Sequence, residues 1–394
     1  MKININSYLI HSSVLMPFLQ GFVIRDVFFI DLKLFYLVMA INFGLLLPKI
    51  KISTPFLANF LFLIIHGLLG VVYFKFPISP LISQLVGVLI SFIYFSQIIK
   101  LYDVKVIFNL YLKYASFFVI ISLLLFPFNI LDLTPDRLDG IMTEPSKFVL
   151  VNIPAFYYFL AKRNIPKIGL FLVAFLLSSS SAGFLAIILM ILFLILSMKS
   201  IKHIILIFSS SIIMIALLIN NEHFNKRLNS TVENLKALKT HEFKNDTNVS
   251  TLVLLKSAII SVKNLKDHPF GTGLGSYQHI HDTYLNEIKL PRYAYHPKSI
   301  AKGLNKTDAN SLGLRIISDF GIFGVLAIFL FFIYAIFSII NSKNLDSRYI
   351  QIGLFIYLII KLLRMGHYFP EEFFLFLLLF FSNFKVILKK QHIE

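Results

Sequence analysis

The chain contains no cysteine among its 394 residues, so disulfide bonds, thiolate catalysis and thiolate metal sites are excluded. Charged residues are also scarce. They make up 14% of the chain, against roughly 25% in an average soluble domain. In their place, 57% of the residues are hydrophobic and the mean hydropathy is +0.79. Uncharged apolar runs of about 20 residues recur, and this is the length that crosses a bilayer as a helix. These features indicate a polytopic membrane protein with no separate soluble domain.

Acidic residues are outnumbered by basic ones, 20 against 37, which gives a formal net charge of +17. In a soluble protein this balance would suggest nucleic-acid binding. Here much of the positive charge lies in short segments between apolar runs. Membrane topology and anionic lipid explain it more simply, and no nucleic-acid partner is expected. The first apolar run has no small-residue cleavage site, so we expect it to be retained as a span.

The apolar runs are continuous rather than alternating, which predicts helices and not strands. The expected fold class is all-α: a polytopic bundle of about 12 transmembrane helices, with one large extracytoplasmic loop capping the bundle. The expected spans are 7–24, 28–47, 55–75, 79–98, 107–131, 145–161, 166–180, 182–198, 202–220, 313–341, 347–363 and 371–388. The chain, 1–394, is expected to be a single membrane domain. It would hold helices one to nine in 1–220, the large loop in 221–309 and helices ten to twelve in 310–394.

Basic residues mark one side of the membrane. If the N-terminus is cytoplasmic, every inner loop is basic. The basic residues of these loops are Lys49, Lys51, Lys100, Lys105, Lys162, Arg163, Lys167, Lys199, Lys202, Lys343, Arg348, Lys389 and Lys390. The positive-inside rule then predicts cytoplasmic termini and an external loop 221–309, because long loops cross regardless of their charge. Three short segments, 131–143, 178–181 and 364–372, would lie on the same outer face.

The large loop contains one helical pattern and one glycine turn. Apolar residues recur at helical spacing between 248 and 266, with lysines on the other side, and His268-Pro269 ends the pattern. The glycines within 271–275 follow, either as a plain turn or as a backbone nest for an anion. The segment 310–319 is amphipathic and leads into the tenth span. No internal repeat is visible, which weighs mildly against a transporter built from inverted halves.

Four short motifs follow one another in a familiar order. They are 137–140 with 144–146, then 180–183, 268–275 and 314–324. Together with the hairpin 364–370, they resemble the bacterial O-antigen polymerase and ligase family of lipid-linked polysaccharide glycosyltransferases. The resemblance covers roughly 130–385. It implies a multi-pass protein of the bacterial inner membrane, with the large loop in the periplasm.

Three positions depart from the family pattern. Asn310-Ser311 stands where ligase-like members have His-Asn, so a ligase histidine is missing. Ser181 stands where an arginine is common. An arginine often found in the helix before the glycine turn has no clear counterpart, and Lys256 is the nearest basic residue. These departures favour an O-antigen polymerase and keep an O-antigen ligase as the alternative.

The resemblance implies transfer of a glycan from a polyprenyl-diphosphate carrier to a sugar hydroxyl on a second lipid-linked repeat unit. The partners it implies are the polyprenyl-diphosphate-linked oligosaccharide, membrane lipid and a chain-length regulator protein. The reaction needs cations for the departing diphosphate, and arginine suits this because its planar fork pairs bidentately with phosphate. It also needs a general base. If arginines neutralise the diphosphate, no metal or other cofactor is required.

Arg137, Glu144 and His296 are the candidate catalytic residues. Arg137 would pair with the diphosphate, although an interfacial arginine can also be an anchor that snorkels to headgroups. Glu144 would act as the base or orient Arg137. The plainer alternative for Glu144 is a first-turn acid favoured by the helix dipole, with Pro145 at the first helical position. His296 would bond or stack on a sugar.

Further residues would bind the diphosphate or the glycan. This set consists of Arg137, Arg292, Arg315, Arg364, His281 and Tyr295. Arg292 and Tyr295 lie in a tyrosine-rich patch that suits sugars but is also ordinary for a surface loop. Arg315 lies near the outer end of the tenth span, where a buried charge without a role is costly. Arg364 shares a helix face with Lys361. His281 and Asp282 either form a pair that acts as a base or lie in a solvated turn.

Two other classes compete with an enzyme. A transporter or flippase for a lipid-linked or anionic substrate would show repeat symmetry, broken helices and polar residues at the bilayer midplane. This chain instead gathers its polar residues at one membrane face. A non-enzymatic envelope scaffold would lack a cationic cleft in the loop. The presence or absence of such a cleft therefore separates the scaffold from the enzyme.

Overall fold

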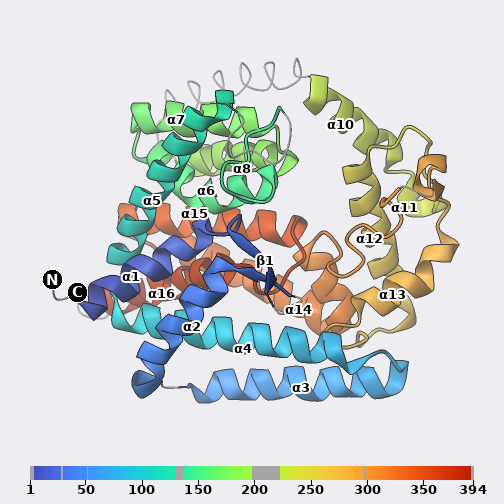
Figure 1. The fold of residues 1–394 in the computed structure, drawn as a ribbon, viewed down its shortest axis with the longest axis horizontal. Helices are drawn as coiled ribbons and strands as arrows, with labels where there is room; N and C mark the ends of the chain where they lie inside the picture. Colours follow the sequence, from blue (N-terminus) through green and yellow to red (C-terminus); the bar gives the residue numbers. More distant parts are fainter. Residues whose placement is uncertain are drawn as a thin grey trace.

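The computed structural model describes residues 4–27, 30–50, 52–128, 136–197, 222–296 and 299–391 (Figure 1). Helices dominate these ranges. The first half contains α1 Ile5–Leu15, β1 Val23–Val27, β2 Ile30–Lys33, α2 Leu34–Leu46, α3 Thr54–Phe74, α4 Ile78–Leu101, α5 Val104–Leu125, α6 Pro145–Ala161, α7 Ile165–Ser178 and α8 Ser181–Ser197. The second half contains α10 Glu222–Asn234, α11 Ala237–Thr240, α12 Val249–Asp267, α13 Tyr277–Tyr284, α14 Leu312–Ile340, α15 Leu345–Leu363 and α16 Phe373–Gln391.

The first two expected spans are wrong as drawn from the sequence. The chain forms the short helix α1, then the antiparallel hairpin β1–β2 with Val23 opposite Lys33, and only then the short helix α2. The apolar run between 7 and 47 is interrupted by a 3-10 turn with Pro17 near its start and by the charged residues of the hairpin. Lys33 pairs with Glu371 at 2.9 Å, which ties the base of the hairpin to the segment before α16.

Four helices of the described ranges are long and apolar enough to cross a membrane: Thr54–Phe74, Ile78–Leu101, Val104–Phe128 and Leu312–Ile340. Shorter apolar helices cover Leu34–Leu46, Ile165–Ser178, Ser181–Leu196 and Phe373–Phe384. The helices over the other expected spans begin and end within a few residues of the expected bounds, except for 202–220, which lies outside the described residues. The apolar helices indicate an integral membrane protein. The number of twelve spans stays a prediction.

The core lies where α6 and α15 pack against each other (Figure 1). The two helices approach closely at Gly353, where an added Cβ would come within 3.0 Å of the Pro154 carbonyl oxygen. Most residues of both helices are buried, because α5, α7, α8, α14 and α16 surround them. By contrast, Gly67 and Gly70 are the buried residues of α3, so this helix presents an apolar face to its surroundings. A surface of this kind suits lipid contact.

The helices α10 to α13 lie at one end of the bundle, and the described ends of α1 and α16 lie at the other (Figure 1). These loop helices have a small hydrophobic core of their own. Its larger members are Phe243, Leu252, Leu255, Ile259, Ile260, Tyr277, Ile280 and Tyr284. The amphipathic helix expected at 248–266 is present as α12, and it packs against the first part of α14. The segment therefore folds on the bundle rather than extending away from it.

The glycine turn locks into a kink in α14. Gly321 breaks this helix with φ 58° and ψ −132°, so the amphipathic part before it, 312–320, is a separate helical segment. The Gly273 N–H donates to the Asp319 carbonyl at 2.9 Å, and the Ile322 N–H donates to the Pro269 carbonyl at 2.8 Å. An added Cβ on Gly321 would lie 2.1 Å from the latter oxygen. Glycine is required because both the close approach and the positive φ exclude a side chain.

The backbone N–H groups of the turn are used within the protein, which supports the plain-turn interpretation over an anion nest. Gly271, Thr272 and Gly273 donate to backbone carbonyls, and Gly275 donates to the Asp319 carboxylate at 3.3 Å. His66 of α3 bonds the Phe270 carbonyl at 3.0 Å. Irregular backbone at the depth of a membrane helix is tolerated only where the protein satisfies its polar groups. The turn is therefore a structural joint between α3, α4 and α14.

Candidate functional site

A polar cavity of about 190 Å³ lies beside the first turn of the loop helix α12, which contributes Ser250 to its lining. It is lined by Arg137, Glu144, Ser146, Ser180, Ser181, Ala182, Ser250, Asn310, Arg364 and Met365. These residues come from five separate stretches of the chain. The cavity therefore unites the motif at 137–146, the motif at 180–183 and the hairpin after α15, as the expected common face required.

Arg137 reaches the cavity from the segment before α6. Its Nε donates to the Ser178 carbonyl and its Nη2 donates to the Ser179 carbonyl, each at 3.1 Å. These carbonyls are at the C-terminal end of α7, where Ser179 takes a left-handed conformation with φ 45°. A cation is favoured at a helix C-terminus by the helix dipole. The half-buried guanidinium is thus held in one orientation by a rigid turn, as a ligand for an oxyanion should be.

Glu144 also lines the cavity, at the position before the first residue of α6. Its side chain is exposed and accepts a hydrogen bond from Ser146 Oγ at 3.0 Å. It makes no capping bond to the N-terminus of α6, where Pro145 occupies the first helical position. The carboxylate is therefore directed by the serine and not by the helix. That arrangement leaves it available to accept a proton.

Four helices begin at this cavity. Glu144 and Ser146 flank the start of α6, Ser181 starts α8, Ser250 is in the first turn of α12, and Asn310 precedes α14. The N-terminal end of a helix carries partial positive charge and favours an anion. Together with Arg137 and Arg364, these helix ends make the cavity electropositive. Its chemistry suits a phosphate or diphosphate group.

The wall beside Asn310 is a strained turn. Ala309 and Asn310 both have left-handed conformations, with φ 60° and 52°, which are uncommon for residues other than glycine. Asp308 holds the turn: its Oδ1 accepts from the Asn310 N–H at 3.1 Å, and its Oδ2 lies 3.1 Å from His367 Nε2. Strain of this kind persists where the surroundings over-determine the backbone, often at functional sites. The sequence showed Asn310 only as a departure from the ligase pattern.

Arg315 lies outside the lining of the cavity. It is 2% exposed, its guanidinium stacks over the Tyr368 ring at 4.4 Å, and its Nη1 donates to the Gly366 carbonyl at 3.1 Å. Asp319 is 3.8 Å away. The arginine thus fixes the hairpin that carries Arg364. Its expected contact with the diphosphate stays a prediction, and these contacts favour a positioning role.

The expected sugar-binding residues of the loop also lie away from the cavity lining. Arg292, Tyr295 and His296 belong to an exposed 3-10 turn and the residue after it, where the Tyr295 hydroxyl accepts from the Leu290 N–H at 3.3 Å. Sequence reasoning instead missed Ser180, Ser250 and Asn310 as lining residues. No signal in the sequence pointed to Ser250, because α12 reads as an ordinary amphipathic helix.

Lys256 proves to be a structural residue. It is buried in α12, and its ammonium donates to the backbone carbonyls of Lys302 at 2.8 Å and Leu304 at 3.3 Å. Burial lowers the pKa of this ammonium to about 8, with Asp282 acting in the opposite direction. The contacts hold the segment 301–304 against α12. The position nearest the family's arginine therefore holds the segment 301–304 and does not line the cavity.

His281 is 1% exposed within the core of the loop helices, and its Nδ1 lies 3.0 Å from Asp282 Oδ1. Burial is the largest effect on this imidazole, and it lowers the pKa below the usual 6.5, against the opposing pull of Asp282. His281 therefore stays neutral as the unfolded state begins to gain a proton. The stability of the loop is full above pH 6.5 and should fall as the pH drops below it.

Limited proteolysis of the purified protein tests this pH dependence. Cleavage within 241–296 should accelerate as the pH falls from 7 to 5.5, and His281→Gln should flatten the dependence because it removes the titrating group. His279→Gln is the matched control, since that histidine also lies on α13 and is more exposed. A His281→Gln protein that keeps the full acid sensitivity would assign the effect to another group.

The described residues contain no group of three or more His, Cys, Asp or Glu side chains that could hold a metal ion. The apolar helices indicate an integral membrane protein, and Arg137 and Arg364 line a polar cavity among its described residues.

Residues 168–329 match the model of a family described as O-antigen ligase. The matched segment contains the motif at 180–183, the loop helices, the glycine turn and the kink of α14. Arg137, Glu144 and Arg364 lie outside it. The match confirms the resemblance to the O-antigen polymerase and ligase-like family. Enzymes of this family are glycosyltransferase-like ligases and polymerases, which supports a function of that type. No curated protein matches the chain.

Proposed function

We propose that the protein is a polymerase of O-antigen or a related surface polysaccharide. It transfers the growing glycan from a polyprenyl diphosphate to a lipid-linked repeat unit at the periplasmic face of the bacterial inner membrane. The observation that carries this proposal is the cavity in which Arg137 and Arg364 meet the N-termini of four helices. A departing diphosphate is the group that needs such a site, because negative charge develops on it as the glycosidic bond breaks.

In this reaction an acceptor hydroxyl oxygen attacks the anomeric carbon of the donor glycan. The bond from that carbon to the diphosphate oxygen breaks, and the electron pair leaves with the diphosphate. Arg137 and Arg364 neutralise the leaving group without a metal ion or other cofactor. Glu144 accepts the proton of the acceptor hydroxyl. The charges therefore balance within the groups that line the cavity.

Polymerase is preferred to ligase because Asn310-Ser311 replaces the His-Asn of ligase-like members. In the structure, Ser311 caps α14 by accepting from the Leu314 N–H at 3.1 Å, and its hydroxyl donates to the Leu362 carbonyl at 2.7 Å. Ser311 is thus committed to holding α14 against α15. The likeness to the family favours ligase equally, so the two activities must be separated by experiment.

Deletion of the gene should leave single repeat units on the surface lipid, because a missing polymerase spares export and attachment of one unit. Gel analysis of the surface polysaccharide would show this as the loss of the ladder with one band kept. Loss of every attached unit would identify a ligase. Accumulation of lipid-linked units at the cytoplasmic face would identify a transporter or flippase, which is the alternative from another class.

The proposed orientation places both termini in the cytoplasm and 221–309 in the periplasm. Because the chain has no cysteine, one introduced thiol reports its own location. Asp246→Cys, at an exposed position of the loop, should react with an impermeant thiol reagent in intact spheroplasts. Lys343→Cys, between α14 and α15, should react only after lysis. The reverse pattern would overturn the orientation and with it the periplasmic site. We also propose a chain-length regulator protein as a partner of the polymerase.

A further inference from the structure

Four side chains that line the polar cavity have hydrogen-bonding groups that the protein does not use. They are the hydroxyls of Ser180, Ser181 and Ser250 and the carboxamide of Asn310. None of these groups makes a hydrogen bond within the part of the chain that the structure describes. Ser180 is only 2% exposed, and a buried polar group without a partner costs free energy. These groups point to a ligand that has hydrogen-bonding groups of its own.

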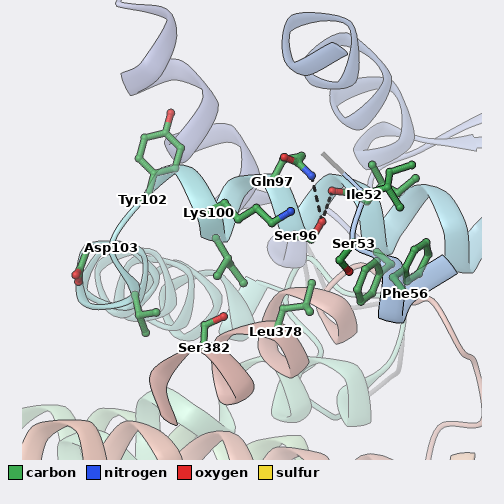
Figure 2. Close-up of a pocket in the computed structure, with 14 residues that line it drawn as sticks. Ile52, Ser53, Phe56, Ser96, Gln97, Lys100, Tyr102, Asp103, Leu378 and Ser382 are labelled. Atoms are coloured by element: carbon green, nitrogen blue, oxygen red, sulfur yellow. Dashed lines mark hydrogen bonds between the residues drawn. The ribbon is translucent and has the colours of Figure 1, made fainter. Parts of the chain in front are cut away.

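A larger cavity, of about 490 Å³, lies where α3 begins, α4 ends and α5 begins, and its polar groups differ in this respect. Ser96 Oγ donates to the Ile93 carbonyl at 2.8 Å and accepts from Gln97 at 3.5 Å (Figure 2). Its lining carries one lysine, Lys100, and one aspartate, Asp103. The larger cavity therefore does not favour one kind of ligand.

Two of the four side chains in the polar cavity follow the turn that holds Arg137. The carbonyls of Ser178 and Ser179 accept from this arginine, and Ser180 and Ser181 are the next residues of the chain. In the proposed reaction, the anomeric carbon of the first sugar is bonded to an oxygen of the diphosphate. A sugar ring joined to a diphosphate at Arg137 therefore lies beside these hydroxyls.

The other two side chains come from backbone that is fixed by its own hydrogen bonds. Asn248 Oδ1 accepts from the Ser250 N–H at 3.0 Å, and the Asn248 N–H donates to Ser230 Oγ at 3.0 Å. These bonds fasten the start of α12 to α10. Asp308 holds the backbone of Asn310 in the same way, at 3.1 Å. Groups that are held in place before a ligand arrives lose less freedom on binding.

The acceptor atoms of the lining distinguish a sugar from further phosphate. Phosphate oxygens mainly accept hydrogen bonds, and Asn310 Oδ1 and the Glu144 carboxylate are also acceptors. A sugar hydroxyl both donates and accepts, so it can satisfy the carboxamide and the serine hydroxyls together. The volume of about 190 Å³ is below the roughly 300–1,000 Å³ of a site for a drug-sized ligand. The cavity therefore suits the reacting end of a lipid-linked glycan and not a whole repeat unit.

We propose that Ser180, Ser181, Ser250 and Asn310 bind the hydroxyl groups of the first sugar ring of the donor, the ring that is joined to the diphosphate. Ser250 belongs to the large loop and Asn310 directly follows it, so the loop contributes to the choice of sugar. This inference rests on the proposed function, because it takes the arginines of the same cavity as the diphosphate site.

The test compares the binding of two lipids to the purified full-length protein by native mass spectrometry. One is polyprenyl diphosphate without a sugar, and the other is the lipid-linked repeat unit extracted from cells that lack the protein. Ser250→Ala and Asn310→Gly should each raise the Kd of the sugar-bearing lipid about three- to tenfold, the range for a lost neutral hydrogen bond. Each should change the Kd of the bare lipid less than about twofold. Glycine suits position 310 because Asn310 has φ 52°.

Thr307→Ala is the matched control, because Thr307 is an exposed hydroxyl residue close to Asn310 and lies outside the lining. It should bind both lipids as the wild-type protein does. An unchanged Kd for the sugar-bearing lipid in Ser250→Ala and Asn310→Gly would overturn the proposal and leave water as the partner of these groups. Equal weakening for both lipids would also overturn it, because the side chains would then serve the diphosphate or the fold.

Arg137→Gln separates this inference from the proposed function. Loss of the charge should weaken the binding of both lipids alike, because both carry the diphosphate. If neither Kd changes in Arg137→Gln, the diphosphate site fails and the proposed function fails with it. The sugar site is judged by a different quantity, the ratio of the two Kd values in Ser250→Ala and Asn310→Gly. The two failures are therefore observed in different variants.

Discussion

Arg137→Lys should lower the rate of polymer formation by about 30- to 1000-fold, which corresponds to roughly 2–4 kcal/mol of lost transition-state stabilisation. Arg137 already donates from Nε and Nη2 to the carbonyls of Ser178 and Ser179. A lysine has one ammonium in place of the planar fork, so it cannot hold these two carbonyls and face a diphosphate in the same geometry. The expected loss is therefore in the chemical step.

The measurement is single-turnover transfer between purified lipid-linked repeat units, at matched protein abundance. Arg292→Lys is the matched control, because Arg292 is exposed and lies outside the cavity lining. It should keep the wild-type rate within about twofold, as expected for an exposed side chain away from the site. A lipid-interface anchor would also tolerate lysine, which snorkels as arginine does. A wild-type rate in Arg137→Lys would therefore leave only the anchoring role and remove this arginine from the proposed mechanism.

Glu144→Gln should slow transfer by about 100- to 10,000-fold, the range typical of a lost general base. The amide has nearly the same shape and can still accept the hydrogen bond from Ser146, which is 3.0 Å in the wild-type protein. Because the Glu144 side chain makes no capping bond to α6, the substitution should leave the start of that helix intact. The loss is therefore expected in the rate of proton removal and not in folding.

Three readouts separate a base from a structural acid. The single-turnover rate should fall, binding of the lipid-linked donor should stay near wild type, and Glu144→Asp should recover part of the rate. Glu242→Gln is the matched control, since Glu242 is an exposed carboxylate of the loop that pairs with Lys289 at 3.5 Å. Equal rates in Glu144→Gln and wild type would assign proton removal to another group and leave Glu144 as a plain residue of the helix start.

The sequence predicted most helices of the described ranges, because a continuous apolar run has one stable form in a bilayer. It failed at the first two spans, where β1 and β2 interrupt the run. Hydropathy averaged over a window hides a few charged residues between two apolar stretches. Those residues acquire their structure from partners far away, as Lys33 does from Glu371, and no local pattern shows such a partner.

The candidate site was predictable in part. Arg137, Glu144 and Arg364 carried motifs, and placing them on one outer face anticipated their meeting in one cavity. Arg315 looked equally suited to bind the diphosphate, because the sequence around a buried arginine near a helix end does not show what the arginine contacts. Only the structure shows it beneath the hairpin, against Tyr368 and the Gly366 carbonyl. The residue type therefore identifies a candidate, but only its contacts in the folded protein show whether it lines the cavity or holds another segment in place.

By itself, the sequence determined that the chain is an integral membrane protein of helices with its polar chemistry gathered toward one face. That outcome follows from apolar length and charge placement, which are local properties of the chain. The tertiary structure decided that five stretches between Arg137 and Met365 share one cavity. It also decided that the glycine turn packs into the kink of α14, with most of its N–H groups bonded within the protein. Both outcomes depend on which helices pack together, and contacts between distant segments are set by the shapes of whole faces rather than by any short motif.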